Sequence, residues 1–186
     1  MAKDQSLYFI AIMPPSNISD EVTRFKQDFV TRFNARAALK NMPHITLKAP
    51  FIFPRVHHEQ TLCWFENMQI TVPSFKQELR DFDAFHNRRS AVIFVKPVMN
   101  VFLDRLQKQV LKNFGETYSH ENILKQELDF KPHMTIAYRD LQPNLFKEAW
   151  KEYETKKYAA GFDVNNFRLL QHNGKAWNII STYNLP

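Results

Sequence analysis

The chain has 186 residues, of which 44% are hydrophobic, and it carries a formal net charge of +6. Cys63 is the single cysteine, which excludes an intrachain disulfide and argues against a secreted scaffold, so we expect a reducing cytoplasm. The apolar run at residues 7–13 is far shorter than the ~20 residues of a membrane span, and no cleavage pattern follows it. We therefore expect a compact protein without a membrane partner. Its basic charge suits a phosphorylated partner, but a soluble basic surface explains it equally well.

The first predicted elements are a strand and a helix. Residues 7–13 have the length and composition of a buried strand, which Pro14 and Pro15 end. Apolar residues then recur every three or four positions, which predicts an amphipathic helix. The apolar stripe consists of Ile18, Val22, Phe25, Phe29 and Phe33. A second strand follows around His44 and is predicted to end in a loop at 50–54.

The rest of the chain predicts a similar alternation of elements. In order, these are a weak helix at 57–67, a strand at 75–79, a polar turn at 87–90, a strand at 91–95 and a helix at 102–114 closed by Gly115. A strand around His133 follows, and then a helix at 146–153. Two last strands are joined across Asn173-Gly174, which is a strong hairpin signal. The order strand, helix, strand occurs twice, which predicts an α+β protein of two similar lobes that meet at a cleft.

Two tetrapeptides of the same form begin the strands that follow the long helices. They are His44-Ile45-Thr46-Leu47 and His133-Met134-Thr135-Ile136, and a proline precedes each of them. Because strand side chains alternate between faces, each His shares a face with its Thr. A lone His-x-Thr is more often a coincidence than a site, but the repeat in matching context predicts a function. If the strands are neighbours, one cleft holds two imidazoles and two hydroxyls.

These residue types suit the cleavage of a phosphodiester. The ordinary pKa of histidine, about 6.5, lets one imidazole be neutral while the other is protonated. The neutral ring can accept a proton from water, and the protonated ring can deliver one to the departing ribose oxygen. The Thr46 and Thr135 hydroxyls can donate to the nonbridging phosphoryl oxygens, where charge accumulates in the transition state. The residues alone do not say which ring is the base, and we predict His133 as the base and His44 as the acid.

The paired motifs, each on a strand after a helix, resemble the signatures of the 2H phosphoesterase superfamily and, within it, the 2′-5′ RNA ligase-like branch. The resemblance covers nearly the whole chain in element order and concentrates in the motifs. It implies a bilobal α+β fold, with two pseudo-symmetric lobes of antiparallel sheet flanked by helices around a central cleft, formed by residues 1–186 as a single domain. It also implies metal-independent hydrolysis of 2′,3′-cyclic phosphates at RNA ends or in small nucleotides, without a cofactor. The implied catalytic residues are His44, Thr46, His133 and Thr135.

Residues near the motifs are candidates for substrate binding. Lys48 lies two positions after Thr46, so it is predicted to share that face and to add positive charge near the phosphate. Arg139 lies beyond Ala137 on the second strand. Aromatic side chains could stack on a nucleobase, although core packing explains a buried aromatic at least as often. The aromatic candidates are Tyr8, Phe9, Phe51 and Tyr138.

The remaining motifs carry no predicted chemistry. The five other histidines lack a repeating context and are predicted to be surface residues; they are His57, His58, His86, His120 and His172. No metal-binding or phosphate-loop spacing is present, so neither a metal nor ATP is implied. Three alternatives to hydrolysis stay open: binding of an RNA end or nucleotide without turnover, 2′-5′ RNA ligation, and a partner-binding protein that retains the fold. We expect a monomeric protein.

Overall fold

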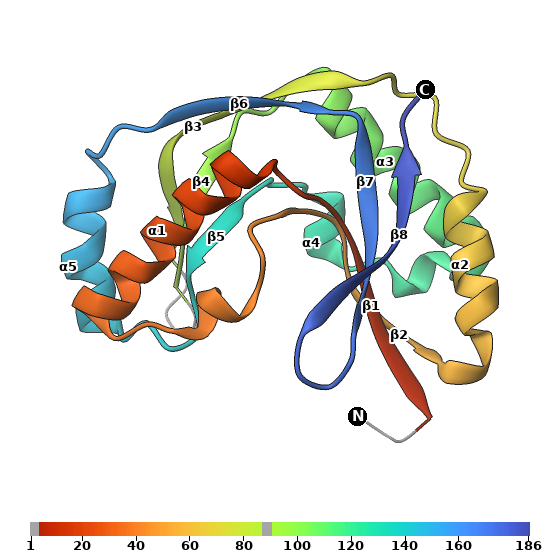
Figure 1. The fold of residues 1–186 in the computed structure, drawn as a ribbon, viewed down its shortest axis with the longest axis horizontal. Helices are drawn as coiled ribbons and strands as arrows, with labels where there is room; N and C mark the ends of the chain where they lie inside the picture. The colour runs from red at the N-terminus through yellow and green to blue at the C-terminus, as the bar shows by residue number, and fades with distance from the viewer. Residues whose placement is uncertain (1–3, 87–90) are drawn as a thin grey trace.

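The computed structural model describes residues 4–86 and 91–186, and these form two four-stranded antiparallel sheets (Figure 1). The strand orders are β2-β1-β7-β8 and β5-β4-β3-β6. The first sheet contains β1 (Gln5–Ile12), β2 (Ile45–Pro54), β7 (Asn166–His172) and β8 (Trp177–Asn184). The second contains β3 (Phe75–Phe85), β4 (Val92–Pro97), β5 (Met134–Ala137) and β6 (Ala159–Val164). The predicted α+β fold with two antiparallel lobes is confirmed, while the predicted turn at 87–90 lies outside the described residues.

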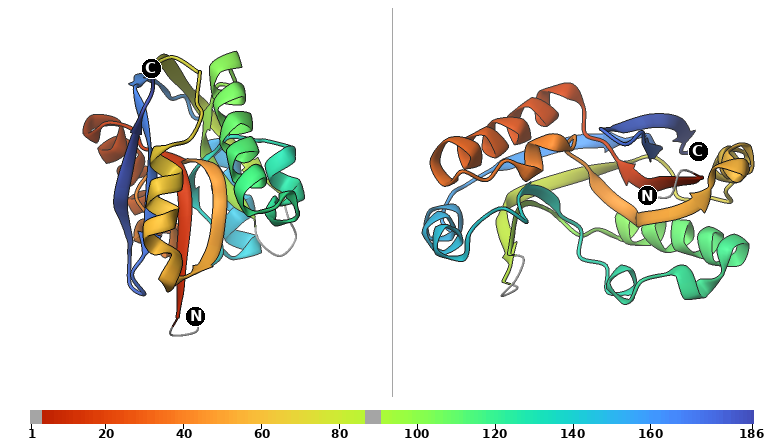
Figure 2. Two further views of the ribbon diagram at one scale, coloured as in Figure 1. Left: turned by 90° about the vertical axis from the view of Figure 1, so that its right-hand side faces the viewer. Right: turned by 90° about the horizontal axis from the view of Figure 1, so that it is seen from below.

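The long helix of each half packs against the sheet of the other half. The α-helices are α1 (Ser16–Phe33), α2 (His58–Glu66), α3 (Val101–Tyr118), α4 (Lys125–Leu128) and α5 (Pro143–Tyr153). Helix α1 follows β1 but packs against β5, and α3 follows β4 but packs against β2. Figures 1 and 2 show α1 and α5 together at one end of the molecule, with α2, α3 and α4 at the other. This reciprocal exchange joins the two lobes.

Helix α1 forms where its apolar stripe predicts it, but its buried face includes one residue that was not predicted to be buried. The helix ends at Asn34, whose left-handed conformation (φ 51°) is a common C-terminal cap. Lys26 is only 2% exposed and lies on the buried face between Val22 and Phe29. The predicted stripe residue Phe25 is only partly buried. The helix therefore carries an ammonium group into the interior.

Two predicted boundaries are wrong and one strand was not predicted, for identifiable reasons. The predicted loop at 50–54 belongs to β2, because an edge strand tolerates the prolines there. Helix α3 continues past Gly115 to Tyr118. A Cβ at Gly115 would lie 2.3 Å from the ring of His120, so this glycine makes room for a neighbouring ring instead of ending the helix. Strand β6 was not predicted, since Gly161 interrupts its alternation.

Buried side chains from both sheets form one continuous cluster. In the second lobe, the ring centroid of Tyr153 lies 4.8 Å from that of Phe29 and 4.9 Å from that of Phe82. In the first lobe, the rings of Phe51 and Phe114 are 5.0 Å apart. Such aromatic pairs add about 0.5–1.5 kcal/mol each beyond their burial. Within residues 4–86 and 91–186, every helix is too short or too polar to cross a membrane.

Candidate active site

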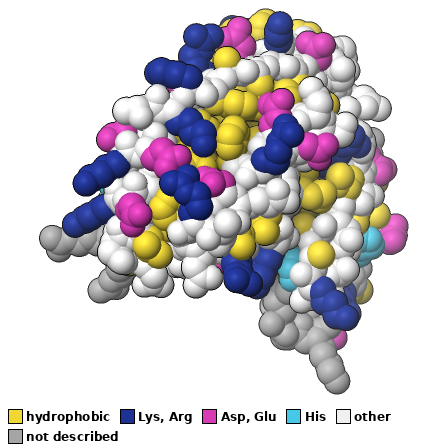
Figure 3. All heavy atoms as spheres, turned by 60° about the vertical axis from the view of Figure 1, so that its left-hand side comes forward, with side chains coloured by type: hydrophobic (Ala, Val, Ile, Leu, Met, Phe, Trp, Pro, Cys, Tyr) yellow, Lys and Arg dark blue, Asp and Glu magenta, His cyan; other side chains and the backbone are white. Residues whose placement is uncertain are grey.

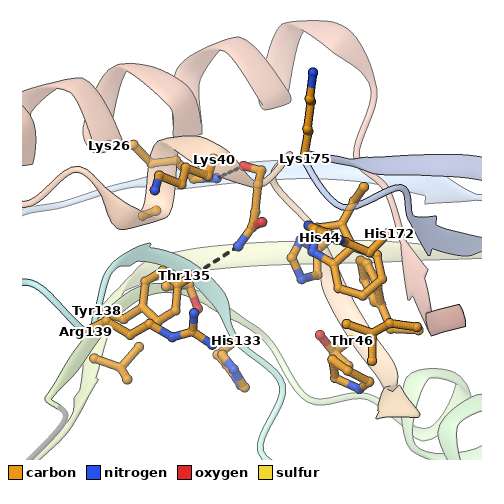
Figure 4. A pocket seen from close by; sticks show the side chains of 17 residues that line it. Lys26, Lys40, His44, Thr46, His133, Thr135, Tyr138, Arg139, His172 and Lys175 are labelled. Atoms are coloured by element: carbon orange, nitrogen blue, oxygen red, sulfur yellow. Dashed lines mark hydrogen bonds between the residues drawn. The ribbon is translucent and has the colours of Figure 1, made fainter. Parts of the chain in front are cut away.

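The four motif side chains line one cleft of about 510 Å³ whose walls come from both sheets. Figure 4 shows His44 and Thr46 on one side and His133 and Thr135 on the other. Strand β2 is the outermost strand of its sheet and pairs with β1, while β5 is outermost and pairs with β4. The two motifs thus hold equivalent positions in the two lobes, and the structure brings all four predicted catalytic residues together.

Both imidazoles are held by the same local contact. The Nδ1 atom of His44 lies 2.6 Å from the carbonyl oxygen of Met42, and that of His133 lies 2.8 Å from the carbonyl oxygen of Lys131. A carbonyl can only accept, so each Nδ1 carries a proton and donates it. In the neutral ring this leaves the lone pair on Nε2. Each histidine is therefore prepared to exchange a proton through Nε2.

Aromatic neighbours fix the planes of the two rings. The ring of His44 lies 5.0 Å from that of Phe9, measured between centroids. The ring of His133 lies 5.1 Å from Phe85 and 5.6 Å from Phe94. Since these neighbours cannot form hydrogen bonds with the imidazoles, the rings are oriented without competing polar contacts.

Burial lowers the pKa of both histidines. The pKa of His44 falls from 6.5 to about 4, mainly because burial disfavours the charged ring; the hydrogen bond to Met42 opposes this, while the positive charge of Lys26 and the proximity of His133 add to it. The pKa of His133 is also lowered, again mainly by burial, against the effect of its bond to Lys131. Both rings are consequently neutral near pH 7 in the free protein.

The prediction that Lys48 faces the phosphate is wrong. Ile10 pairs with Lys48 and Ala11 with Thr46, so Leu47 is an extra residue in β2, a β-bulge that breaks the alternation of faces. Lys48 is only 1% exposed, and its Nζ lies 3.1 Å from Oε2 of Glu127. Burial lowers the pKa of this lysine, against the attraction of the carboxylate. Lys48 is a buried structural cation outside the cleft lining.

The predicted aromatic binding residues divide into two groups. Phe51 and Tyr8 are 7% and 0% exposed and stack on each other at 5.7 Å, so the core and not a ligand explains them. Phe9 lines the cleft, but its ring packs between His44 and Trp177. Tyr138 lines the cleft, and its stacking on a nucleobase stays a prediction.

Arg139 also lines the cleft, with its guanidinium carbon 5.0 Å from the centre of the Tyr138 ring. Its φ of 57° is left-handed. This places the two predicted residues after β5 side by side at the cleft wall.

Sequence reasoning missed several residues that line the cleft. The added residues are Lys26, Lys40, Asn41, His172, Lys175 and Trp177. His172, for which only a surface position was predicted, also lines the cleft, because the β7–β8 hairpin turns it towards the cleft. Its Nδ1 accepts the N–H of Gly174 at 3.1 Å, so in the neutral ring the proton lies on Nε2. The repeat pattern could not reveal these residues, because they have no counterpart in the other half.

A second hollow of about 470 Å³ adjoins the first and shares Thr46 and His133 with it. Phe85, Phe130 and Pro50 contribute apolar surface to its lining. Hence Thr46 and His133 lie at the junction of the two hollows. Within the described part of the chain, there is no group of three His, Cys, Asp or Glu side chains that could hold a metal ion.

Comparison with models of protein families identifies one family. A family model described as the 2′-5′ RNA ligase superfamily matches residues 14–176. A protein of Bacillus cytotoxicus named "Putative phosphoesterase" is 27% identical over 179 residues, which is 95% of each chain.

Among solved structures, TT0787 of Thermus thermophilus superposes with a TM-score of 0.69 at 18% identity, covering 96% of this chain and 97% of that one. E. coli LigT complexed with 3′-AMP superposes with a TM-score of 0.64 at 16% identity, covering 98% and 99%. At these identities the structures establish the shared fold.

Proposed function

This chain belongs to the 2′-5′ RNA ligase superfamily, and on that premise we propose that it is a metal-independent phosphodiesterase that hydrolyses 2′,3′-cyclic phosphates. Its substrates are RNA ends or small nucleotides that carry this group. The observation that carries the proposal is the placement of His44, Thr46, His133 and Thr135 around one cleft, with both Nδ1 atoms tied to a carbonyl. A fold family alone would not support a specific reaction.

The proposed reaction uses the two rings in opposite protonation states. One neutral Nε2 accepts a proton from water as the water oxygen forms a bond to phosphorus. The other ring, protonated on both nitrogens, gives its Nε2 proton to the ribose oxygen as the bond from phosphorus to that oxygen breaks. The products are a terminal phosphate and a free ribose hydroxyl. The hydroxyls of Thr46 and Thr135 donate to the nonbridging oxygens as they gain charge.

Substrate binding raises the pKa of one ring, which then takes up from solvent the proton that the free site lacks. Both histidines have lowered pKa values in the free protein, so the acid is formed only when an anionic phosphate raises the pKa of one ring. The lower pKa of His44 favours its neutral, proton-accepting form. That is opposite to the sequence-based prediction of His133 as the base, which stays a prediction until the leaving group is varied.

The proposal is tested by following hydrolysis of adenosine 2′,3′-cyclic phosphate and of a short RNA with a 2′,3′-cyclic end, both in EDTA. We expect turnover in the unmodified protein and a loss of about 10²- to 10⁴-fold in each of the variants His44→Ala and His133→Ala. Unchanged activity in either variant removes that ring from the reaction. Tight binding of both compounds without turnover would instead identify a binding module.

A further inference from the structure

One wall of the cleft, which we call the basic wall, is built from Lys26, Lys40, Asn41, Tyr138 and Arg139. It joins helix α1 and the 3₁₀ helix η1 (Ala37–Lys40) to the end of β5. Figure 4 shows Lys26, Lys40, Tyr138 and Arg139 on the side of the cleft away from Thr46. The motif residues do not require this wall for the reaction proposed above, so its chemistry needs a separate explanation.

The charge of the cleft lining is one-sided. Four cations, Lys26, Lys40, Arg139 and Lys175, are among the described residues that line it, and none of those residues is acidic. On the outer face seen in Figure 3, by contrast, basic and acidic side chains alternate. One exposed pair joins Arg32 of α1 to Glu152 of α5 at 2.5 Å. Positive charge is therefore concentrated in the cleft, whereas on the outer surface basic residues are balanced by acidic ones.

Lys26 is the strongest feature of the basic wall. Its side chain is 98% buried, the complement of its 2% exposure, and its Nζ donates to the carbonyl oxygen of Asn41 at 2.8 Å. An ammonium has three N–H donors, and this is the one hydrogen bond it makes with the described residues. No described carboxylate lies within the 4.0 Å of an ion pair. Burial lowers its pKa to about 8, so it remains mostly charged at pH 7.

The polar groups around Lys26 are held in place. Asn41, whose carbonyl binds Lys26, donates from Nδ2 to the Tyr138 hydroxyl at 3.0 Å. Behind this contact, Oδ2 of Asp140 accepts the N–H groups of Arg36 and Ala37 at 2.7 and 2.9 Å. These bonds fix η1 to the segment after β5. The carboxylate of Asp140, the residue after Arg139, thus binds two backbone amides through Oδ2, while its buried Oδ1 has no hydrogen-bond partner among the described residues. The hydrogen bonds of Asn41 and Asp140 hold the basic wall in place before an anion binds.

A buried, incompletely satisfied ammonium is costly unless an anion completes its contacts. The reacting cyclic phosphate has a single negative charge, and in the proposed reaction it is bound by the two threonines and the protonated imidazole. On a ribose whose 2′ and 3′ oxygens form the cyclic phosphate, the 5′ oxygen is the position that can carry another phosphate. The cleft, at about 510 Å³, lies in the size range of small-molecule sites.

We propose that the basic wall, centred on the buried ammonium of Lys26, binds a second phosphate of the substrate, the one on the 5′ oxygen of the ribose that carries the cyclic phosphate. This rests on the function proposed above and specifies its substrate class. In an RNA end the second phosphate is the diester that links the preceding nucleotide. In a mononucleotide it is a 5′-phosphate.

The test compares three substrates that share one reacting group: adenosine 2′,3′-cyclic phosphate, the same compound with a 5′-phosphate, and the dinucleotide ApA with a 2′,3′-cyclic end. We expect kcat/KM to be about 10- to 100-fold higher for one or both 5′-phosphorylated substrates, the range of a charged hydrogen bond. A gain with the dinucleotide assigns the wall to RNA chains, and a gain with the monoester assigns it to nucleotides.

The variant Lys26→Met keeps the volume of the side chain and removes its charge. It should reduce the preference for 5′-phosphorylated substrates by at least about 10-fold, mainly through KM. Lys40→Gln should reduce it less, because Lys40 is exposed. The matched control is Lys147→Gln, an exposed lysine on α5 outside the cleft lining, which should keep the full preference. Thermal unfolding of each variant shows that it is folded.

Two results would overturn the inference. One is equal kcat/KM for all three substrates in the unmodified protein, and the other is an equal loss on all three in Lys26→Met, which would assign Lys26 to the reacting phosphate. If no substrate is hydrolysed, the proposed function fails but the wall can still be tested. Adenosine 3′,5′-bisphosphate should then bind at least about 10-fold more tightly than 3′-AMP, and Lys26→Met should remove the difference; equal binding would reject the wall as a phosphate site.

Discussion

Strands β2 and β5 begin with the same His-x-Thr form, and each ties its imidazole to the carbonyl two residues earlier, at 2.6 and 2.8 Å. Beyond the threonine they differ. In β2 a bulge turns Lys48 into the core, where it pairs with Glu127. After β5 the chain turns at Arg139 and lines the cleft. The duplication therefore extends only as far as the His-x-Thr motif.

The residues that follow the two threonines occupy equivalent positions but have different contacts. The continuation of the first motif connects the two halves of the sequence: one Glu127 oxygen accepts the N–H of Ala49 at 2.7 Å, and the other accepts the N–H of Leu124 at 2.8 Å as well as the Lys48 ammonium. The continuation of the second motif forms part of the basic wall. The motif residues are thus symmetric in this protein, whereas we propose that the residues after them serve stability in one half and substrate selection in the other.

The largest expected effect comes from removing either imidazole, and it tests whether the two rings have different roles. On a cyclic phosphate, His44→Ala and His133→Ala should each cost about 10² to 10⁴-fold in kcat/KM. In a nitrophenyl phosphodiester, the nitrophenolate leaves without taking up a proton. This substrate should therefore largely restore the activity of the variant that lacks the acid. Restoration of His133→Ala would make His44 the base, as its low pKa favours, and restoration of His44→Ala would support the sequence-based assignment. Restoration of both or neither would contradict a paired acid and base.

The next effect is on the free energy of unfolding, which should depend on the contacts after the first motif and not on those after the second. Glu127→Ala leaves the buried Lys48 ammonium and two backbone N–H groups without their acceptor. We expect a loss of about 3–5 kcal/mol in the free energy of unfolding, measured with urea. The matched variant Arg139→Asn, at an exposed position whose left-handed backbone asparagine tolerates, should change it by less than about 0.5 kcal/mol. Similar losses in both would remove the proposed division of tasks.

A smaller effect tests whether the two threonines are equivalent. Thr46→Val and Thr135→Val keep the shape of the side chain and remove the donor, and each should lower kcat by about 10²-fold. The serine variants should retain most activity, because they keep the hydroxyl. Steady-state kinetics on the cyclic phosphate distinguish these cases. If valine at one position is harmless, the motif repeat is catalytic on one side only.

The smallest expected effect is a shift in the pH profile. The plot of kcat/KM against pH should be bell-shaped, with its acidic limb near pH 4 from His44 and its alkaline limb below pH 6.5 from His133, since both pKa values are lowered. Lys26 is one of the charges that lower the pKa of His44, so Lys26→Met should move the acidic limb upward by up to about one pH unit. The control Lys147→Gln should leave the acidic limb where it is. An unchanged limb in Lys26→Met as well would show that the charge of Lys26 does not affect the pKa of His44.

Local patterns predicted the motifs and most elements, because the period of the apolar residues and the Asn173-Gly174 hairpin are set by neighbours in sequence. They failed where distant contacts decide. The bulge at Leu47 depends on pairing with β1, so alternation alone placed Lys48 on the wrong face. The position of His172 depends on how the hairpin turns relative to the second sheet. Lys26 was visible at the helical spacing of Val22 and Phe29, but its charge kept it out of the predicted core.

Each strand that begins with a motif histidine is the outermost strand of its sheet, and unpaired strand edges can template pairing with other chains and cause aggregation. Three features counter this hazard here. Strand β5 is only four residues long. Strand β2 is bulged, and its Ala49 N–H is already bound by Glu127. The contact between Glu127 and β2 therefore also occupies a backbone donor on a motif strand that a second copy of the protein could otherwise use to extend the sheet.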